Sequence, residues 1–97
     1  MGREDIIERI KARAEAVRSL GATALYIYGS RARGDDRPDS DLDVFVDFDP
    51  GRFSFVELVE LEEMLARELG LKVQLGTHDA LHPLVKSAIE HEAIRVL

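Results

Sequence analysis

The chain carries two long stretches in which apolar residues recur every three or four positions among charged ones. This period predicts amphipathic helices over residues 3–20 and 54–69, and a glycine directly after each stretch would end the helix in the left-handed conformation. In the second stretch we expect these residues to face the core: Phe55, Leu58, Val59, Leu61, Leu65 and Leu69.

Three shorter apolar segments predict strands. Residues 24–28 form an unbroken apolar run, which is typical of a strand buried on both faces. Residues 41–48 alternate, so that one face joins the core while the other is lined by acidic residues and Phe45. Residues 71–76 form the third strand. Together the elements indicate one small α/β (α+β) domain over residues 1–97, with helices packed mainly on one face of a short mixed sheet.

The connections contain residues that favour turns. Ser30 is expected to cap a short helix that ends at Gly34, and the polar residues 35–40 predict a loop. Near the end of the chain, Pro83 suits the first turn of a last helix. The apolar tail, residues 94–97, is expected to pack either on the sheet or on another subunit.

The composition narrows the class of protein. A formal net charge of −6 over 97 residues would repel phosphate backbones, so we expect no direct binding to nucleic acid or to an anionic membrane. The chain has no cysteine, so neither a disulfide scaffold nor a thiolate metal site can form. No apolar run approaches the roughly 20 residues of a membrane span, and the charged N-terminal segment lacks the apolar core of a signal peptide. We therefore expect a cytoplasmic protein.

Two carboxylates in the second predicted strand are candidate metal ligands. Asp41 and Asp43 stand two positions apart, so both side chains leave the strand on the same face, about 6.5–7 Å apart at the backbone. Mg²⁺ prefers oxygen ligands and commonly takes one or two carboxylates together with substrate phosphate. The same pair could instead belong to a strand face that exposes two acids to water.

The Gly29-Ser30 pair after the first strand is a candidate phosphate site. Gly29 allows a close approach of the backbone, Ser30 offers a hydroxyl donor, and the start of the next helix presents free N–H groups. Arg31 and Arg33 could add positive charge close to a phosphate. The alternative is an ordinary strand-to-helix turn with a solvated basic rim.

The two half-sites together are more specific than either alone. The pattern of Gly29-Ser30, ten further residues and then Asp41-Leu42-Asp43 resembles the signature of the DNA polymerase β-like nucleotidyltransferase superfamily. A longer run resembles the minimal nucleotidyltransferase (MNT) family of the MntA type, and its sequence is GSRARGDDRPDSDLDVFVDFDP. A later segment and the helix after it look similar to the third strand and closing segment of that family, and the segment reads LKVQLGTHDALHP.

The resemblance implies a small nucleotidyltransferase fold and a defined chemistry. Ser30 and the adjoining backbone would hold the β- and γ-phosphates of ATP, and Asp41 and Asp43 would hold Mg²⁺. An acceptor hydroxyl would displace pyrophosphate at the α-phosphorus, a reaction that depends on charge neutralisation and in-line positioning. Members of the family are often antitoxins that transfer AMP from ATP to a tyrosine hydroxyl of a HEPN-type toxin, so a hetero-oligomer with such a toxin is expected.

One position departs from the family pattern. Gln74 stands where the family usually carries a third acid, which is expected to bind the catalytic metal and to help deprotonate the attacking hydroxyl. An amide oxygen can coordinate Mg²⁺ but cannot act as a base, and Asp47, two pleats beyond Asp41, is a poor substitute. Two hypotheses stay open: an adenylyltransferase impaired at Gln74, or a non-catalytic antitoxin that neutralises its partner by binding alone. A third alternative is a transferase for a small-molecule acceptor.

The remaining candidates favour structural roles. His78, His82 and His91 do not follow a metal-binding spacing, and His82 is interpreted as a capping or packing residue. Tyr26 and Tyr28 share one face of the first strand, and we interpret them as core residues rather than as a platform for a nucleotide base.

Overall fold

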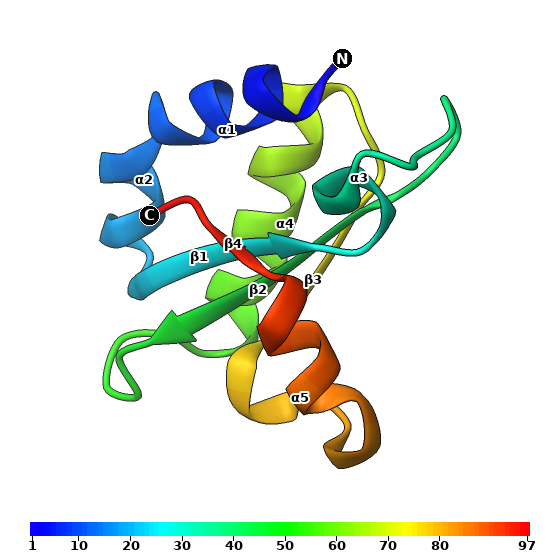
Figure 1. The fold of residues 1–97 in the computed structure, drawn as a ribbon. Coiled ribbons are helices and arrows are strands. Elements are labelled where there is room, and N and C mark those ends of the chain that lie inside the picture. The colour runs from blue at the N-terminus through cyan, green and yellow to red at the C-terminus, as the bar shows by residue number, and fades with distance from the viewer.

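The sheet of the protein contains four strands in the order β3-β2-β1-β4 (Figure 1). The computed structural model describes residues 1–97, and its strands are β1 (Ala22–Tyr28), β2 (Leu42–Phe48), β3 (Val73–Thr77) and β4 (Ile94–Arg95). Strand β1 runs antiparallel to both of its neighbours, β2 and β4, whereas β2 and β3 are parallel. The predicted mixed sheet is confirmed, and the apolar tail packs on this sheet as β4.

The single N-terminal helix predicted over residues 3–20 is wrong, because the segment folds as α1 (Arg3–Lys11) and α2 (Ala14–Ser19). Arg13 leaves the helical region at φ −107° and ψ 18°, and its N–H bonds to the carbonyl three residues earlier at 2.9 Å, which closes a tighter turn. The break allows α1 to contact α4 (Phe55–Leu69) while α2 contacts β1. No proline or glycine marks the break, since it follows from packing on a twisted sheet.

Helix α4 begins and ends as the sequence predicts. Ser54 is the N-cap, its N–H donates to the Glu57 carboxylate at 2.8 Å, and Gly70 ends the helix at φ 64°. The prediction that Phe55 and Val59 face the core is wrong, because Phe55 is 76% exposed and Val59 is 38% exposed.

Phe53 explains why the first turn of α4 faces solvent. This residue lies in the segment before the helix, is only 7% exposed, and packs with its ring centroid 5.4 Å from that of Phe48. Because an aromatic ring from the loop already covers this end of the core, Phe55 and Val56 stay exposed, and Leu58 is the apolar residue of the first turn that packs against the core.

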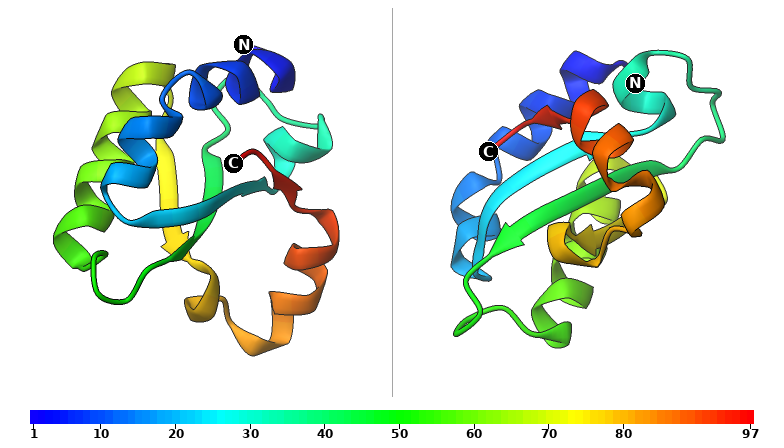
Figure 2. Two further views of the ribbon diagram at one scale, coloured as in Figure 1. Left: turned by 90° about the vertical axis from the view of Figure 1, so that its left-hand side faces the viewer. Right: turned by 60° about the horizontal axis from the view of Figure 1, so that its bottom comes forward.

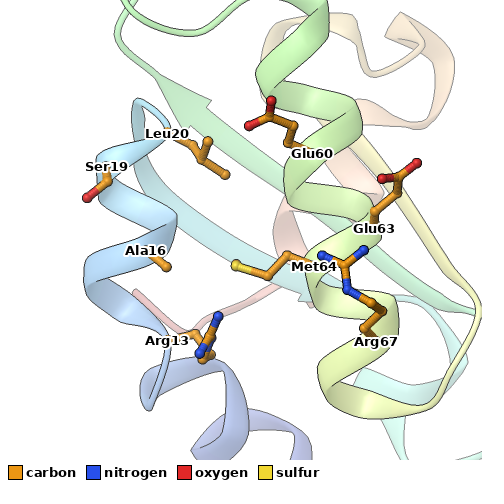
Figure 3. Close-up of a pocket in the computed structure, with 8 residues that line it drawn as sticks. All are labelled: Arg13, Ala16, Ser19, Leu20, Glu60, Glu63, Met64 and Arg67. Atoms are coloured by element: carbon orange, nitrogen blue, oxygen red, sulfur yellow. The ribbon is translucent and has the colours of Figure 1, made fainter.

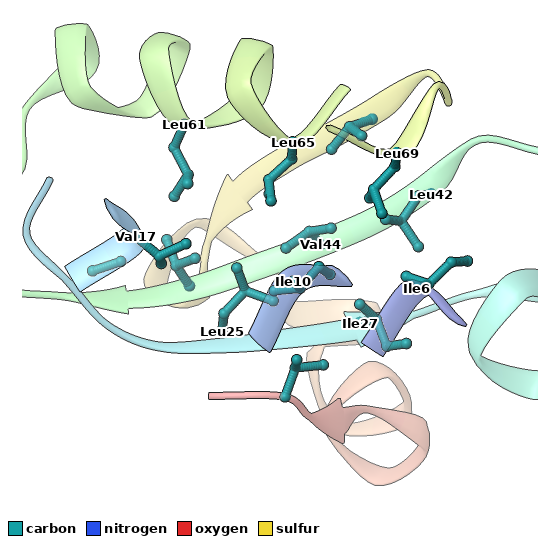
Figure 4. Packing of buried hydrophobic residues seen from close by; sticks show 14 of the residues in the cluster. Ile6, Ile10, Val17, Leu25, Ile27, Leu42, Val44, Leu61, Leu65 and Leu69 are labelled. Carbon is teal, nitrogen blue, oxygen red and sulfur yellow. The ribbon is translucent and has the colours of Figure 1, made fainter. Parts of the chain in front are cut away.

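One face of the sheet forms the hydrophobic core together with α1, α2 and α4 (Figure 4). Leu25 of β1, Val44 of β2 and Leu65 of α4 are completely buried there. Because side chains alternate along a strand, Phe45 points to the other face, where its ring stacks on Tyr26 at a centroid distance of 4.7 Å. The predicted alternation of β2 is therefore confirmed.

The opposite face of the sheet carries η1 (His78–Ala80) and α5 (Pro83–Glu92), as the two views in Figure 2 show. His82 caps α5, because its Nδ1 accepts a hydrogen bond from the backbone N–H of Leu84 at 3.1 Å. The capping role predicted for His82 is confirmed. None of the helices combines the length and the apolar character that a membrane crossing requires.

The outer edge of β3 is covered by a side chain from α4. Strand β3 has a neighbouring strand on one side alone, and the backbone N–H of Leu75 donates to the Glu62 carboxylate at 3.0 Å. This hydrogen bond satisfies a main-chain donor at the edge of the sheet.

Candidate active site

Strand register brings three separate parts of the sequence to one end of the sheet. Tyr28, the last residue of β1, is paired with Asp43 of β2, and Asp43 is paired in turn with Gln74 of β3. The Gly29-Ser30 turn follows β1 directly. The turn, the carboxylates and Gln74, which the sequence analysis assigned to one site, are therefore neighbours across the sheet.

Gly29 makes the close contact between the turn and the carboxylates. Its φ is 77°, and a Cβ at this position would collide with the Asp43 carboxylate. Gly29 is the N-cap of α3 (Ser30–Arg33), so the expectation that Ser30 caps this helix is wrong. The backbone changes direction at the glycine, one residue earlier, and Ser30 is already helical. Gly34 ends α3 in the left-handed conformation, as predicted.

The carboxylates of Asp41 and Asp43 are half-buried and act on each other. Burial raises the pKa of Asp43, the negative charge of Asp41 raises it further, the Arg33 guanidinium lowers it, and Glu92 adds a smaller rise. Gln74 donates from Nε2 to Oδ2 of Asp41 at 2.9 Å. A bound cation would offset the cost of keeping these charges together, so the pair has the character of a cation site.

The two arginines of the turn have different surroundings. Arg31 is 4% exposed, and its guanidinium donates to the carbonyls of Ser40 at 2.9 Å and Pro38 at 3.3 Å and to the Asp36 carboxylate at 3.3 Å. The structure thus brings Arg31 to the loop over residues 34–41, which it braces, and its role as a phosphate ligand stays a prediction. The Arg33 side chain is 48% exposed, and its charge acts on the Asp43 carboxylate.

Glu92, at the end of α5, lies in the site although no sequence pattern marks it. Its carboxylate accepts hydrogen bonds from the Gly29 N–H and from Nη1 of Arg33, each at 3.0 Å. The residue stands 63 positions after Gly29 in the sequence. The one sequence signal that could have indicated this role of Glu92 is its place just before the apolar tail. When the tail joins the sheet and Ile94 pairs with Ile27, the end of α5 comes to lie beside β1.

Besides Asp43, β2 contains one more acid, Asp47, which is engaged away from the pair of Asp41 and Asp43. Its Oδ1 lies 2.7 Å from Nδ1 of His78, and Nε2 of the same ring lies 2.6 Å from Glu90. Hydrogen bonds to Glu90 and then to Asp47 raise the pKa of His78. Asp47 therefore links β2 to η1 and α5.

The two tyrosines of β1 also differ. Tyr26 stacks on Phe45, which confirms its packing role. Tyr28 is half-buried beside the site, and burial, followed by the negative charges of Asp43 and Glu92, raises the pKa of its hydroxyl. Tyr28 is consequently a neutral hydrogen-bonding group at physiological pH.

The donor set fits a divalent cation that takes part of its ligands from a substrate. The structure contains no group of three His, Cys, Asp or Glu side chains that could hold a metal ion. Asp41 and Asp43 supply two carboxylates, and Gln74 adds a neutral amide beside them. Mg²⁺ commonly combines one or two carboxylates with water and phosphate oxygens. The site therefore suits Mg²⁺ bound together with a triphosphate rather than alone.

Two cavities differ in their relation to the carboxylates. The cavity beside the site has a volume of about 340 Å³ and is lined by Tyr28, Gln74, Leu75, Gly76, Thr77, Ala80, Leu81, His82, Val85 and Ile89. The larger one, about 460 Å³, lies between α2 and α4 (Figure 3) and is lined by Arg13, Ala16, Ser19, Leu20, Glu60, Glu63, Met64 and Arg67. Of these two cavities, only the smaller one shares residues, Tyr28 and Gln74, with the group around the carboxylates.

Comparisons with known sequences identify one protein family. The family model described as nucleotidyltransferase domain matches residues 7–96. A protein of Methanocaldococcus jannaschii, named "Putative protein adenylyltransferase MJ1379", is 44% identical over 75 residues, which cover 75% of each chain. The protein adenylyltransferase MntA of Thermococcus cleftensis is 34% identical over 77 residues, which cover 79% of this chain and 77% of the relative.

Solved structures share the arrangement of the sheet and helices. A structure named as that of a "putative minimal nucleotidyltransferase" superposes with a TM-score of 0.73 at 37% identity and covers 97% of this chain and 95% of its own. A toxin–antitoxin crystal structure with AMP-PNP gives a TM-score of 0.71 over 100% of this chain and 73% of its own. At 18% identity, this second likeness concerns the fold alone.

Proposed function

The chain belongs to the nucleotidyltransferase domain family, and we propose that it transfers AMP from ATP to a hydroxyl group of a partner protein. The contact between the Gly29 turn and the Asp43 carboxylate, with Asp41 beside it, carries this proposal. The contact joins a turn that can approach phosphate to a pair of carboxylates that can hold a cation. Transfer from a triphosphate needs both in one place.

Each residue of the site has a role in this reaction. Asp41 and Asp43 would hold Mg²⁺, which when bound neutralises charge on the triphosphate and the departing pyrophosphate. Ser30 donates its hydroxyl hydrogen to a phosphate oxygen, and Arg33 supplies positive charge. Gln74 orients Asp41 through the 2.9 Å hydrogen bond but cannot accept the proton of the attacking hydroxyl. We therefore expect that proton to pass to water and the transfer to be slow.

The proposed partner is a toxin of the HEPN type. This chain would serve as its antitoxin in a hetero-oligomer, with a tyrosine hydroxyl of the toxin as the acceptor. Two observations support the proposal: the MNT-like run from Gly29 to Asp43, and the identity of 34% with the adenylyltransferase MntA.

A labelling experiment tests the transfer. The protein is mixed with ATP labelled at the α-phosphate, Mg²⁺ and the toxin encoded beside its gene. We expect label on a toxin tyrosine, lost after chelation of Mg²⁺ and in Asp43→Ala, and retained in Asp79→Ala, which removes an exposed acid outside the site. A toxin that stays unlabelled with the unmodified chain would show that the transfer proposal is wrong.

Gln74 supports a second candidate function, inhibition of the toxin by binding alone. With an amide at the position of the family's third acid, the site keeps its nucleotide-binding residues but lacks a base. The double variant Asp41→Ala/Asp43→Ala, assayed without ATP, separates the two functions. If it still neutralises the toxin, binding is sufficient; if neutralisation is lost while the complex forms, the chemistry is required.

The variant Gln74→Asp tests the role of the missing acid. A carboxylate at this position can accept the proton of the attacking hydroxyl, so we expect transfer to the toxin to rise at least about tenfold. The matched control Gln74→Asn has the same length without the charge and should show no gain. Equal transfer rates for Gln74→Asp and the unmodified chain would contradict the assignment of Gln74 to the position of the family's third acid.

A further inference from the structure

One carboxylate joins the backbone of Gly29 and the side chain of Arg33, the two parts of the turn proposed to face the nucleotide. Oε1 of Glu92 accepts from the Gly29 N–H at 3.0 Å, and Nη1 of Arg33 donates to Oε2 at 3.0 Å and to Oε1 at 3.3 Å. The backbone of the turn and its exposed arginine are therefore fixed by the same side chain, which belongs to the last turn of α5.

These hydrogen bonds leave the arginine prepared for an anion. Asp35 accepts from Nε of Arg33 at 3.1 Å, and Glu92 occupies Nη1. The two carboxylates hold the guanidinium plane from two sides, so that its Nη2 group is left to donate to a phosphate oxygen. A fixed guanidinium loses less side-chain entropy on binding than a free one.

The position of Glu92 is itself fixed by the sheet. Two residues later the chain enters β4, where Ile94 pairs with Ile27 of β1. The N–H of Val96 donates to the carbonyl of Leu25 at 2.8 Å, and the Val96 side chain is 5% exposed. The carboxylate thus stands on a backbone that is anchored beside the strand whose end carries the turn.

We infer that Glu92 is a positioning residue for the nucleotide, which holds the Gly29 turn open to phosphate and directs Arg33 at the triphosphate. This inference rests on the proposed function and adds to it a residue from the opposite end of the chain. Glu92 touches neither the reacting atoms nor the cation in this role. It acts through the two groups to which it is hydrogen-bonded.

Binding of AMP-PNP with Mg²⁺, measured by calorimetry, tests the inference without any transfer. We expect Glu92→Ala to raise Kd about tenfold, because it releases the hydrogen bonds to the Gly29 N–H and to Arg33. Glu92→Gln keeps an oxygen that can accept from the Gly29 N–H and should stay within about threefold of the unmodified chain. Asp79→Ala, which removes an exposed carboxylate outside the site, is the control and should bind like the unmodified chain.

Two further measurements separate positioning from a purely structural role. The amide proton of Gly29 should shift upfield in Glu92→Ala and stay near its original position in Glu92→Gln, as followed by NMR without nucleotide. Glu92→Asp keeps the charge but shortens the side chain by one methylene, and it should weaken AMP-PNP binding as Glu92→Ala does. This variant also keeps the test decisive if Glu92→Ala does not fold.

The outcomes distinguish the inference from the function on which it rests. Equal Kd values for Glu92→Ala and the unmodified chain would overturn the inference alone. Tighter binding by Glu92→Ala would overturn it as well, because Glu92 would then compete with phosphate for the turn. If the unmodified chain does not bind AMP-PNP with Mg²⁺, the proposed function fails and the inference fails with it.

Discussion

Gly29 and Gly34 flank α3 with positive φ angles of 77° and 84°, but their ψ angles differ, at −160° and 13°, and only Gly29 has a neighbour where a Cβ would lie. Alanine is strained at both positions, and at Gly29 it would also collide with Asp43. We expect Gly34→Ala to lower the free energy of unfolding by about 1 kcal/mol and Gly29→Ala by about 2 kcal/mol or more. Thermal denaturation should place their Tm values roughly 5 °C apart. Equal losses would mean that neither the ψ of Gly29 nor the collision with Asp43 adds a cost.

Asp43 is expected to reduce the stability of the metal-free protein. Burial and the charge of Asp41 raise its pKa above the ordinary 3.8, so the folded chain binds this proton more tightly than the unfolded chain. Stability therefore falls as pH rises from that ordinary value through the raised pKa, and the cost is fully present above it. Asp43→Asn should raise the Tm of the metal-free protein by about 2–4 °C at pH 7 and leave it unchanged near pH 3.

Mg²⁺ together with ATP should reverse this order of stabilities. The ligands would stabilise the unmodified chain by binding its folded form, whereas Asp43→Asn lacks one of the two proposed metal ligands. Denaturation curves with and without both ligands give the comparison. A lower Tm for metal-free Asp43→Asn at pH 7 would show that the carboxylate stabilises the fold.

At the scale of elements, His78 connects three of them. The His78 ring belongs to η1 and is hydrogen-bonded to Asp47 of β2 and Glu90 of α5. Its centroid lies 4.6 Å from the ring centroid of Phe45. The hydrogen bonds to Glu90 and Asp47 raise its pKa above 6.5, so the folded chain favours the imidazolium. This stabilisation is fully present below the ordinary pKa and is lost as pH rises through the raised value.

Replacement of His78 should therefore have a pH-dependent effect. We expect His78→Gln to lower the Tm by about 2–5 °C at pH 6 and by less at pH 9, because the imidazolium and its ion pairs are lost as pH rises. The effect is modest because these ion pairs are partly exposed to water. Melting curves of both proteins across this range measure the difference. His91→Gln, at an exposed histidine of α5, is the control for the replacement.

Elements defined by local signals are predictable from the sequence. The start of α4 at Ser54, its end at Gly70 and the alternation along β2 each depend on residues a few positions apart. The break at Arg13 and the exposure of Phe55 could not be predicted in this way, because the first follows from packing on the sheet and the second from a ring supplied by the preceding loop.

For the whole molecule, Val96 tests the connection between the tail and the site. Its side chain is 5% exposed in the core, so we expect Val96→Ala to lower the free energy of unfolding by about 1–2 kcal/mol. AMP-PNP binding should weaken too, because the tail anchors Glu92. Val56→Ala, at a valine that is 59% exposed, is the control and should change neither quantity. Loss of stability without weaker binding would separate the tail from the site.

The same distinction between local and distant signals applies to the site. Gly29, Asp41 and Asp43 lie within fifteen consecutive positions and form a motif, so the sequence alone brought them together. Gln74 is assigned to the site by the family resemblance, because it stands in the third predicted strand where the family carries its third acid. Glu92 is not, because a single glutamate in a helix acquires its role only when β4 pairs with β1.

The hydrogen bond from Leu75 to Glu62 also limits how the protein can assemble. A partner that extended the sheet at β3 would have to displace the Glu62 carboxylate, and β4 at the other edge offers only two paired residues. Both edges are thus poor templates for an added strand, which protects the free chain from edge-to-edge aggregation. The toxin that we propose as partner would then be held through side-chain surfaces, so its recognition would depend on the amino acids displayed there and not on main-chain pairing.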